Sequence, residues 1–342
     1  MVRIHELLGY AVQGGASDIH LGAGAVPALR IDGEIRRLDF PPLTPEQAKR
    51  IAYSVMNEKQ KTRFENEQEL DFSVGLRGLA RFRVNVFQQV NGIGMVLRYV
   101  PEETWTLDKL NGPGALKKLA ELRHGLVLVT GPTGSGKSTT LAAMIDHINS
   151  TKNHHILTIE DPIEFVHQPK RCVINQREIG AHSKGFSNAL RSALREDPDV
   201  ILVGEMRDLE TIALALTAAE TGHLVFGTLH TNSAVETVDR IVDVFPPQQQ
   251  QQIRTQLSTS LMGVVSQALV KPVNRPGRVA VFEIMVVNSA VRNIIREGKT
   301  HQLTSVMQTG KGEGMRTMGE SAQMLVERGI LTRQQAAHLS NE

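Results

Sequence analysis

The sequence has little of several features that would each indicate a particular kind of protein. It contains one cysteine, Cys172, which excludes an internal disulfide and a cysteine-rich zinc site. The formal net charge is +2, so composition gives no bias toward nucleic acid or acidic lipid. No stretch has the apolar run of a signal peptide or the ~18 apolar residues of a spanning helix. We therefore expect a soluble, cytoplasmic chain, for which peripheral attachment to a membrane complex stays open.

Two patterns of hydrophobicity divide the 342 residues into domains. Residues 1–100 indicate a small α+β domain, in which Asp32-Gly33 marks a hairpin turn and ARFRVNVF, residues 80–87, alternates apolar and polar side chains. Proline, glycine and charge then replace this alternation at residues 101–114, where we place the linker. Residues 115–342 alternate apolar strands with helices, which predicts a mainly parallel sheet covered on both faces and an α/β fold class. After Pro246-Pro247 the chain is predicted to be mostly helical, with one strand at RVAVFEIMV.

The strongest motif is GPTGSGKST, which fits the pattern G-x-x-x-x-G-K-[ST] between an apolar strand and a helix. Glycines at these positions let backbone N–H groups surround phosphates, and the helix N-terminus adds a favourable dipole. Lys137 would neutralise phosphate charge, and Ser138 would ligate Mg²⁺. The predicted nucleotide-binding residues are Gly131, Pro132, Thr133, Gly134, Ser135, Gly136, Lys137, Ser138 and Thr139.

Three acids follow the next predicted strand, in the sequence ILTIEDPIEF. Parallel strands end at a common edge, so Glu160, Asp161 and Glu164 are expected near the phosphates, facing Mg²⁺ and an attacking water. Glu164 is the first choice for general base, and Glu160 and Asp161 would position water or metal. Asp161 has the alternative of being a solvated loop charge.

Two further strand ends carry candidate residues. In DPDVILVGEMRD the strand ends in Gly204-Glu205, where most P-loop enzymes place an aspartate. Glu205 is predicted to reach the Mg²⁺ shell or the attacking water. In TGHLVFGTLHTN, His230 follows the strand and is placed to sense the γ-phosphate, whereas His223 precedes it and is as well explained by a structural role.

Basic residues provide the remaining candidates. Arg81 and Arg83 share one face of a strand whose other face is apolar, so they are either arginine fingers from a separate domain or paired surface charges. Arg191 and Arg195 are weaker candidates for the same role. In AVRNIIRE, residues 290–297, the apolar positions form one helical stripe, and two arginines fall four apart on another face.

Taken together, these motifs resemble the PilT-type retraction ATPases of bacterial type IV pili, within the type II/IV secretion ATPase family. ASDIHL and ARFRVN resemble the family's N-terminal domain, GPTGSGKST is its Walker A motif, and TIEDPIEFVH resembles its Asp box. LREDPDVILVGEMRD resembles the atypical Walker B motif, and TGHLVFGTLHTN the His box. AVRNIIRE is similar to the C-terminal signature AIRNLIRE, with changes at Val291 and Ile294.

This resemblance implies a RecA-like P-loop ATPase domain behind a smaller PAS-like N-terminal domain, assembled as a hexameric ring. It implies a motor that hydrolyses ATP with Mg²⁺ to drive pilus retraction and twitching motility from the cytoplasmic face of the inner membrane. The implied partners are the membrane platform protein of the pilus machine and a PilU-like paralogue, and no nucleic acid is expected. AVRNIIRE would couple ring motion to the platform.

Several alternatives stay open from the sequence. The protein could be a PilU-like accessory motor, another type II/IV secretion-family motor, a nucleic-acid translocase, or a scaffold without catalysis. The four-cysteine zinc motif of the extension ATPases is absent because Cys172 is the only cysteine, which favours retraction over pilus assembly. Lys137 and the acids are all present, which disfavours the scaffold.

Overall fold

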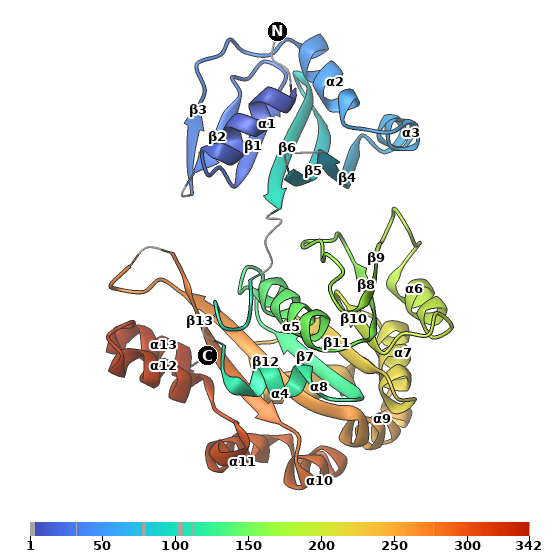
Figure 1. Cartoon of the computed structure of the whole chain (residues 1–342), viewed down its shortest axis with the longest axis vertical. Coiled ribbons are helices and arrows are strands. Elements are labelled where there is room, and N and C mark those ends of the chain that lie inside the picture. The colour runs from blue at the N-terminus through green and yellow to red at the C-terminus, as the bar shows by residue number, and fades with distance from the viewer. Residues whose placement is uncertain are drawn as a thin grey trace. The chain divides into compact units, whose positions relative to one another are not determined.

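The computed structural model divides the chain into two compact units, Met1–Glu103 and Thr104–Glu342 (Figure 1). It describes residues 4–31, 33–76, 80–100, 105–110, 112–275 and 277–341. Asp32 of the predicted hairpin and residues 101–104 and 111 of the predicted linker lie outside the described residues. No helix in the described ranges is long and apolar enough to cross a membrane.

The N-terminal unit contains a six-stranded antiparallel sheet in the order β3-β2-β1-β6-β5-β4. Its strands are β1 (Asp18–Gly22), β2 (Ala28–Ile31), β3 (Glu34–Arg37), β4 (Glu69–Leu76), β5 (Ala80–Gln89) and β6 (Gly92–Val100). Its helices are α1 (Ile4–Gln13), α2 (Pro45–Ser54) and α3 (Glu58–Glu67). The predicted alternation in β5 is confirmed, because Phe82, Val84 and Val86 are fully buried while the residues between them are half-buried. The buried face shares one apolar core with all three helices.

The C-terminal unit is built on a seven-stranded sheet in the order β13-β12-β7-β11-β10-β8-β9, in which only β13 runs antiparallel to its neighbour. Its strands are β7 (Gly125–Thr130), β8 (His155–Glu160), β9 (Val173–Glu178), β10 (Val200–Val203), β11 (Leu224–Leu229), β12 (Leu261–Val270) and β13 (Val279–Val286). Its α-helices are α4 (Gly114–Ala120), α5 (Lys137–Thr151), α6 (Phe186–Ala193), α7 (Leu209–Glu220), α8 (Ala234–Asp243), α9 (Pro247–Ser260), α10 (Ser289–Glu297), α11 (Leu303–Thr309), α12 (Met318–Glu327) and α13 (Arg333–Asn341). The prediction of an α/β protein is confirmed.

Both faces of this sheet are covered. Apolar side chains of α4 and α5 pack on one face, and those of α6 to α10 pack on the other. Every residue of β7 and β11 is consequently buried, which explains why their sequences are continuous apolar runs rather than alternating ones. In such a sheet, a side chain can reach a ligand only beyond the ends of the strands.

The structure also corrects the sequence analysis at two strands. After Pro246-Pro247 the predicted strand at RVAVFEIMV is present as β13 among helices, but it is not the single strand predicted, because LMGVVSQALV forms the ten-residue strand β12 beside β7. A short apolar run without alternation fits a buried strand and a buried helix equally well. The edge strand β9 was also not predicted, since VINQRE carries only two apolar side chains.

Candidate active site

The phosphate-binding motif forms a loop between β7 and α5 at the carboxyl edge of the sheet. Gly131 has φ +140°, and a side chain there would collide with the main-chain carbonyl oxygen of Gln267 on β12. Gly136 has φ +89° and precedes the first turn of α5. Lys137 Nζ donates hydrogen bonds to the carbonyl oxygens of Gly131 at 2.8 Å and Pro132 at 3.0 Å. Glycine is therefore required at positions 131 and 136, where the chain bends around the proposed phosphate site.

The loop fits an anionic ligand. Within the described ranges no side chain caps the N-terminus of α5, so its first N–H groups remain available to an anion. The buried Ser135 Oγ has no hydrogen-bond partner among the described residues. Burial lowers the pKa of Lys137, while the negative charges of Glu205 and Glu164 act in the opposite direction. The lysine and these two acids thus form one electrostatic cluster.

Glu205 lies directly after β10, beside the phosphate-binding loop. Its carboxylate pairs with Arg207 and lies 3.0 Å from His230 Nε2, and its side chain is 19% exposed. A Cβ at Gly204 would lie 3.1 Å from the backbone of Glu160, so the close approach of β8 accounts for the glycine that precedes Glu205. The structure therefore brings Glu205 and His230 together, as their strand ends predict, and adds Arg207, which the sequence analysis did not select although it stands two positions after Glu205 in GEMRD.

The three acids at and after the end of β8 differ in exposure, with Glu160 half-buried and the other two exposed. Glu160 accepts hydrogen bonds from Thr158 Oγ1 at 2.6 Å, from Gln176 Nε2 at 3.2 Å and from the main-chain N–H of Glu164. Burial raises the pKa of Glu160. This geometry indicates that Glu160 holds the loop in place. It does not support the predicted contact of Glu160 with water or metal. Glu164 and Asp161 are exposed, and the charge of Asp161 acts on Arg207.

Three other candidates lie outside this cluster. His223 precedes β11 at the opposite edge, where its Nδ1 lies 3.0 Å from the carbonyl oxygen of Ala218. Arg191 pairs with Glu210, and Arg195 Nη1 donates to the carbonyl oxygen of Arg191 at 2.9 Å. These contacts lie away from the cluster around Lys137 and Glu205, so the structure does not bring these residues to it.

Arg81 and Arg83 lie on β5 in the N-terminal unit, on the face opposite the apolar core. Arg83 stands directly opposite Arg98 on β6, and Arg98 Nε forms an ion pair with Asp18 Oδ1 at 2.8 Å. Although burial opposes it, hydrogen bonds from Arg98 and Ser17 hold the pKa of Asp18 below its usual value. Asp18 thus neutralises Arg98 rather than Arg83.

The fold and this site define the class. A glycine-rich phosphate loop between a strand and a helix, with acids from neighbouring strand ends facing its lysine, is the arrangement of a P-loop nucleotide hydrolase. The model of the type II/IV secretion system protein family matches residues 2–338, and the chain belongs to this family. The prediction of an ATPase of this family is confirmed.

Individual relatives cover nearly the whole chain. The type IV pilus retractation ATPase PilT of Pseudomonas aeruginosa is 56% identical over 97% of this chain and 96% of its own length. A twitching motility protein of Neisseria gonorrhoeae is 56% identical over 90% of this chain and 83% of its own. The crystal structure of the pilus retraction motor PilT with bound ADP superimposes with a TM-score of 0.94 at 52% identity, covering 100% of this chain and 98% of that one.

Proposed function

We propose that this chain is a motor ATPase that drives type IV pilus retraction and twitching motility as a homohexamer. The prediction of a pilus retraction ATPase is confirmed by relatives that carry these functions in their names at 56% identity. In the finer assignment, a RecA-like ATPase unit at residues 115–342 follows a PAS-like unit at 1–100 and a linker at 101–114. The ring would bind the platform protein at the cytoplasmic face of the inner membrane, together with a PilU-like paralogue, and would not act on nucleic acid.

The observation that carries the chemical proposal is that Glu164 and Glu205 both act electrostatically on Lys137. Lys137 now donates to two loop carbonyls, and phosphate oxygens of ATP would replace them as acceptors. Ser138 and Glu205 supply the oxygens that would hold Mg²⁺, which offsets the charge that develops on the phosphates. Among the described residues no group of three or more His, Cys, Asp or Glu could hold a metal, but Mg²⁺ bound through phosphates needs only one or two protein oxygens.

Glu164 and His230 complete the proposed chemistry. Glu164 is exposed on the loop after β8, so a water can reach its carboxylate and transfer a proton to it. His230 lies against Glu205 and would report through it whether the γ-phosphate is present. Glu160 enters the proposal as support for the Glu164 loop, since protein donors surround its carboxylate.

Isosteric variants test this division of roles. Glu164→Gln and Glu205→Gln should bind ADP normally, because neither belongs to the phosphate loop, but should hydrolyse ATP about 10²–10³-fold more slowly. Glu121→Gln is the matched control, since Glu121 is exposed and precedes β7 at the opposite edge of the sheet. Wild-type turnover in both site variants would exclude this active site.

A clean deletion in the cell tests the direction of force. Loss of retraction should leave excess surface pili and no twitching. Loss of pili would indicate assembly instead, and an unchanged phenotype would indicate an accessory motor. Turnover stimulated by DNA or RNA with a steep salt dependence would indicate a translocase.

A further inference from the structure

Two glutamines on the unpredicted strands each contact a loop of the proposed site. Gln176 lies on β9, the edge strand beyond β8, and Gln267 lies on β12, beside β7. Both side chains direct their amides toward backbone groups of a loop rather than toward solvent. A glutamine amide can donate two hydrogen bonds and accept others, so one side chain can fix several points of a loop at once.

Gln176 uses its amide entirely on the loop that carries Glu164. Its Nε2 donates to Glu160 Oε1 at 3.2 Å and to the carbonyl oxygen of Phe165 at 2.8 Å. Its Oε1 accepts from the main-chain N–H of His167 at 2.8 Å. Glu164 lies in sequence between the anchor points Glu160 and Phe165, so the amide holds the chain on both sides of it.

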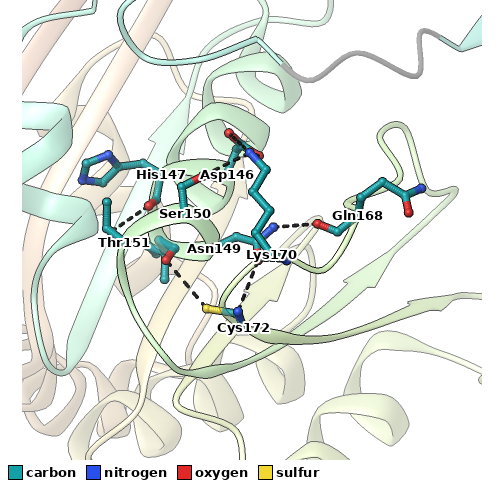
Figure 2. A network of polar contacts seen from close by, with 9 residues as sticks. Asp146, His147, Asn149, Ser150, Thr151, Gln168, Lys170 and Cys172 are labelled. Carbon is teal, nitrogen blue, oxygen red and sulfur yellow. Dashed lines mark hydrogen bonds and ion pairs between the residues drawn. The ribbon is translucent and has the colours of Figure 1, made fainter.

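Neighbouring contacts fix the rest of this loop. The buried Glu178, two residues along β9, accepts from the main-chain N–H of Ile163 at 3.1 Å. Where the loop ends, Asn149 Nδ2 donates to the carbonyl oxygen of Gln168 at 2.8 Å, and Lys170 pairs with Asp146 at 2.7 Å (Figure 2). Asn149 and Asp146 belong to α5, the helix that begins with Lys137. The Glu164 loop is therefore fastened to β9 and to the helix of the phosphate-binding motif.

We propose that Gln176 is a positioning residue that holds Glu164 at the distance its reaction requires. This inference rests on the proposed role of Glu164 as general base. Displacing a reacting group by about 1 Å can cost a factor of ~10² in rate, although the bound substrate is unaffected. Gln176 thus contributes to turnover and not to nucleotide binding.

The contacts of Gln267 independently assign it to the other loop. This buried side chain donates from Nε2 to the carbonyl oxygen of Ser135 at 2.7 Å and accepts at Oε1 from Thr140 Oγ1 at 2.7 Å. It thereby ties the phosphate-binding loop to the first turns of α5. Gln267 thus positions the N–H groups that receive phosphate. Its main contribution is to nucleotide binding rather than to turnover.

The two glutamines provide matched variants with opposite expected effects. Gln176→Met removes the amide at similar length, and we expect kcat to fall about 10–100-fold while KM for ATP and Kd for ADP stay within about twofold. Gln267→Met should instead raise the Kd for ADP about tenfold or more. Asn175→Ala is the control on β9, because Asn175 is exposed and its side chain bonds to His155 at 2.9 Å, away from the loop, and it should leave both constants unchanged.

A double-mutant comparison separates the inference from the function on which it rests. With Glu164→Gln already present, Gln176→Met should lower kcat by less than about twofold, since the group it positions is gone. An equally large fall in both backgrounds would overturn the role of Gln176. So would an unchanged kcat of Gln176→Met in the otherwise wild-type protein, if Glu164→Gln by itself is slow. Wild-type turnover of Glu164→Gln alone would overturn the general base itself. An unchanged Kd for ADP in Gln267→Met would overturn only the assignment of Gln267.

A second variant covers the case in which Gln176→Met fails to fold. Gln176→Glu keeps the acceptor for His167 but places a carboxyl group against Glu160. Two facing carboxyl groups share a proton more readily as pH falls. The shared proton restores a hydrogen bond between position 176 and Glu160. Activity relative to wild type should therefore rise between pH 8 and pH 6. A constant ratio would show that the amide hydrogen bonds do not control turnover.

Discussion

The two sheets make their side chains available for function in different ways. The N-terminal sheet is buried on one face only, so mid-strand residues such as Arg83 and Arg98 lie outside the core. The C-terminal sheet is buried on both faces, and its proposed functional residues lie beyond the strands, as Lys137 and Glu205 do. Candidate functional residues of the first unit are therefore found from alternation within a strand, and those of the second from the positions just beyond a strand's carboxyl end.

The difference also determines what a mid-strand polar residue does. In the central strands of the C-terminal sheet such residues are buried and hydrogen-bonded inside the protein, as Thr130 Oγ1 is to Ser266 Oγ at 2.9 Å. They support the fold or a neighbouring loop. In the N-terminal sheet, the open face lets charged residues point away from the core at little cost in stability. Substitutions at the edge of one sheet and on the face of the other should therefore differ in whether they affect catalysis, stability or both.

The largest effect is expected at the edge of the C-terminal sheet. Lys137→Ala removes the cation on which the charges of both Glu164 and Glu205 act. We expect ATP turnover to fall about 10²–10³-fold or more, with weakened ADP binding, because phosphate charge is no longer neutralised. Calorimetric ADP titration and an ATPase assay measure this, with the exposed Lys118→Ala as control. Normal ADP affinity in Lys137→Ala would contradict the phosphate site.

A smaller effect concerns pH and the buried His167 in the Glu164 loop. Burial lowers the pKa of His167 from 6.5 to about 4, with Asp146 opposing this change and Lys170 adding to it. The unfolded chain therefore takes up a proton near pH 6.5 before the folded chain does. The stabilising contribution is complete above pH 6.5 and is lost as pH falls toward 4, by up to about 3 kcal/mol.

Urea unfolding at pH 7 and pH 4.5 measures this contribution. Because carboxylates also titrate over this range, the relevant quantity is the difference in unfolding free energy between wild type and His167→Phe. Lowering the pH should reduce the unfolding free energy of wild type relative to that of His167→Phe. The difference between wild type and the exposed variant His124→Gln should not change with pH. A difference that is equal at both pH values would show that His167 is not kept neutral by burial.

The sequence was sufficient to predict the site at the level of strand ends. Lys137, Glu164, Glu205 and His230 could be grouped because parallel strands end at one edge, and the structure places these residues in one cluster. Their catalytic roles stay predictions. Glu160 could not be separated from its neighbours, because its burial depends on Gln176 from a strand that the sequence did not reveal.

What the sequence could not provide comes from contacts between distant segments. β12 lacks alternation, and β9 has few apolar residues, so neither has the periodicity that identifies a strand. Gln176 and Gln267 were missed with them, since a glutamine in an unassigned segment has no evident partner. Arg207 was missed because only the folded chain shows that it pairs with Glu205. The proposed assembly of a ring would depend on contacts with other chains, which have no periodic signal in this sequence.

Helix α10 provides a prediction of a stability effect of intermediate size. It also corrects the expectation that both of its arginines are exposed. The sequence predicts Arg292 and Arg296 on one face of the helix, and the family resemblance implies that this helix couples to a platform protein, but Arg292 is half-buried. Its Nη1 donates to the carbonyl oxygens of Ser258 at 2.9 Å and Thr259 at 2.7 Å, at the end of α9. Arg292→Ala should cost about 1–3 kcal/mol, since these carbonyls lose a charged donor.

Arg296→Ala is the matched control for this helix. Its side chain is exposed, so the change in unfolding free energy should stay within about 0.5 kcal/mol. Chemical denaturation compares the two variants directly. If both variants are equally stable, the contact between Arg292 and α9 contributes nothing, and both arginines return as candidates for coupling. If Arg292→Ala alone is unstable, only Arg296 remains suitable for a test of coupling that is free of folding defects.

The smallest stability effect is expected on the open face of the N-terminal sheet, at Arg83. Like charges directly opposite each other on neighbouring strands repel, and Arg83 faces Arg98. Arg83→Ala should therefore leave the unfolding free energy within about 0.5 kcal/mol of wild type or raise it slightly. Arg98→Ala should cost up to about 1 kcal/mol, because the buried Asp18 loses its nearest cation. Thermal unfolding of the two variants measures whether Arg98 stabilises the fold and Arg83 does not.

A mixing experiment then asks what Arg83 is for. If Arg81 and Arg83 act on nucleotide bound to a neighbouring subunit, inactive Lys137→Ala chains mixed with Arg81→Ala/Arg83→Ala chains should regain activity about tenfold above either alone. Recovery must rise with protein concentration, since it depends on mixed rings. A stable mixed oligomer without recovery would leave these arginines as surface charges. The open face would then serve the fold through Arg98 and would not serve the chemistry of a neighbouring subunit.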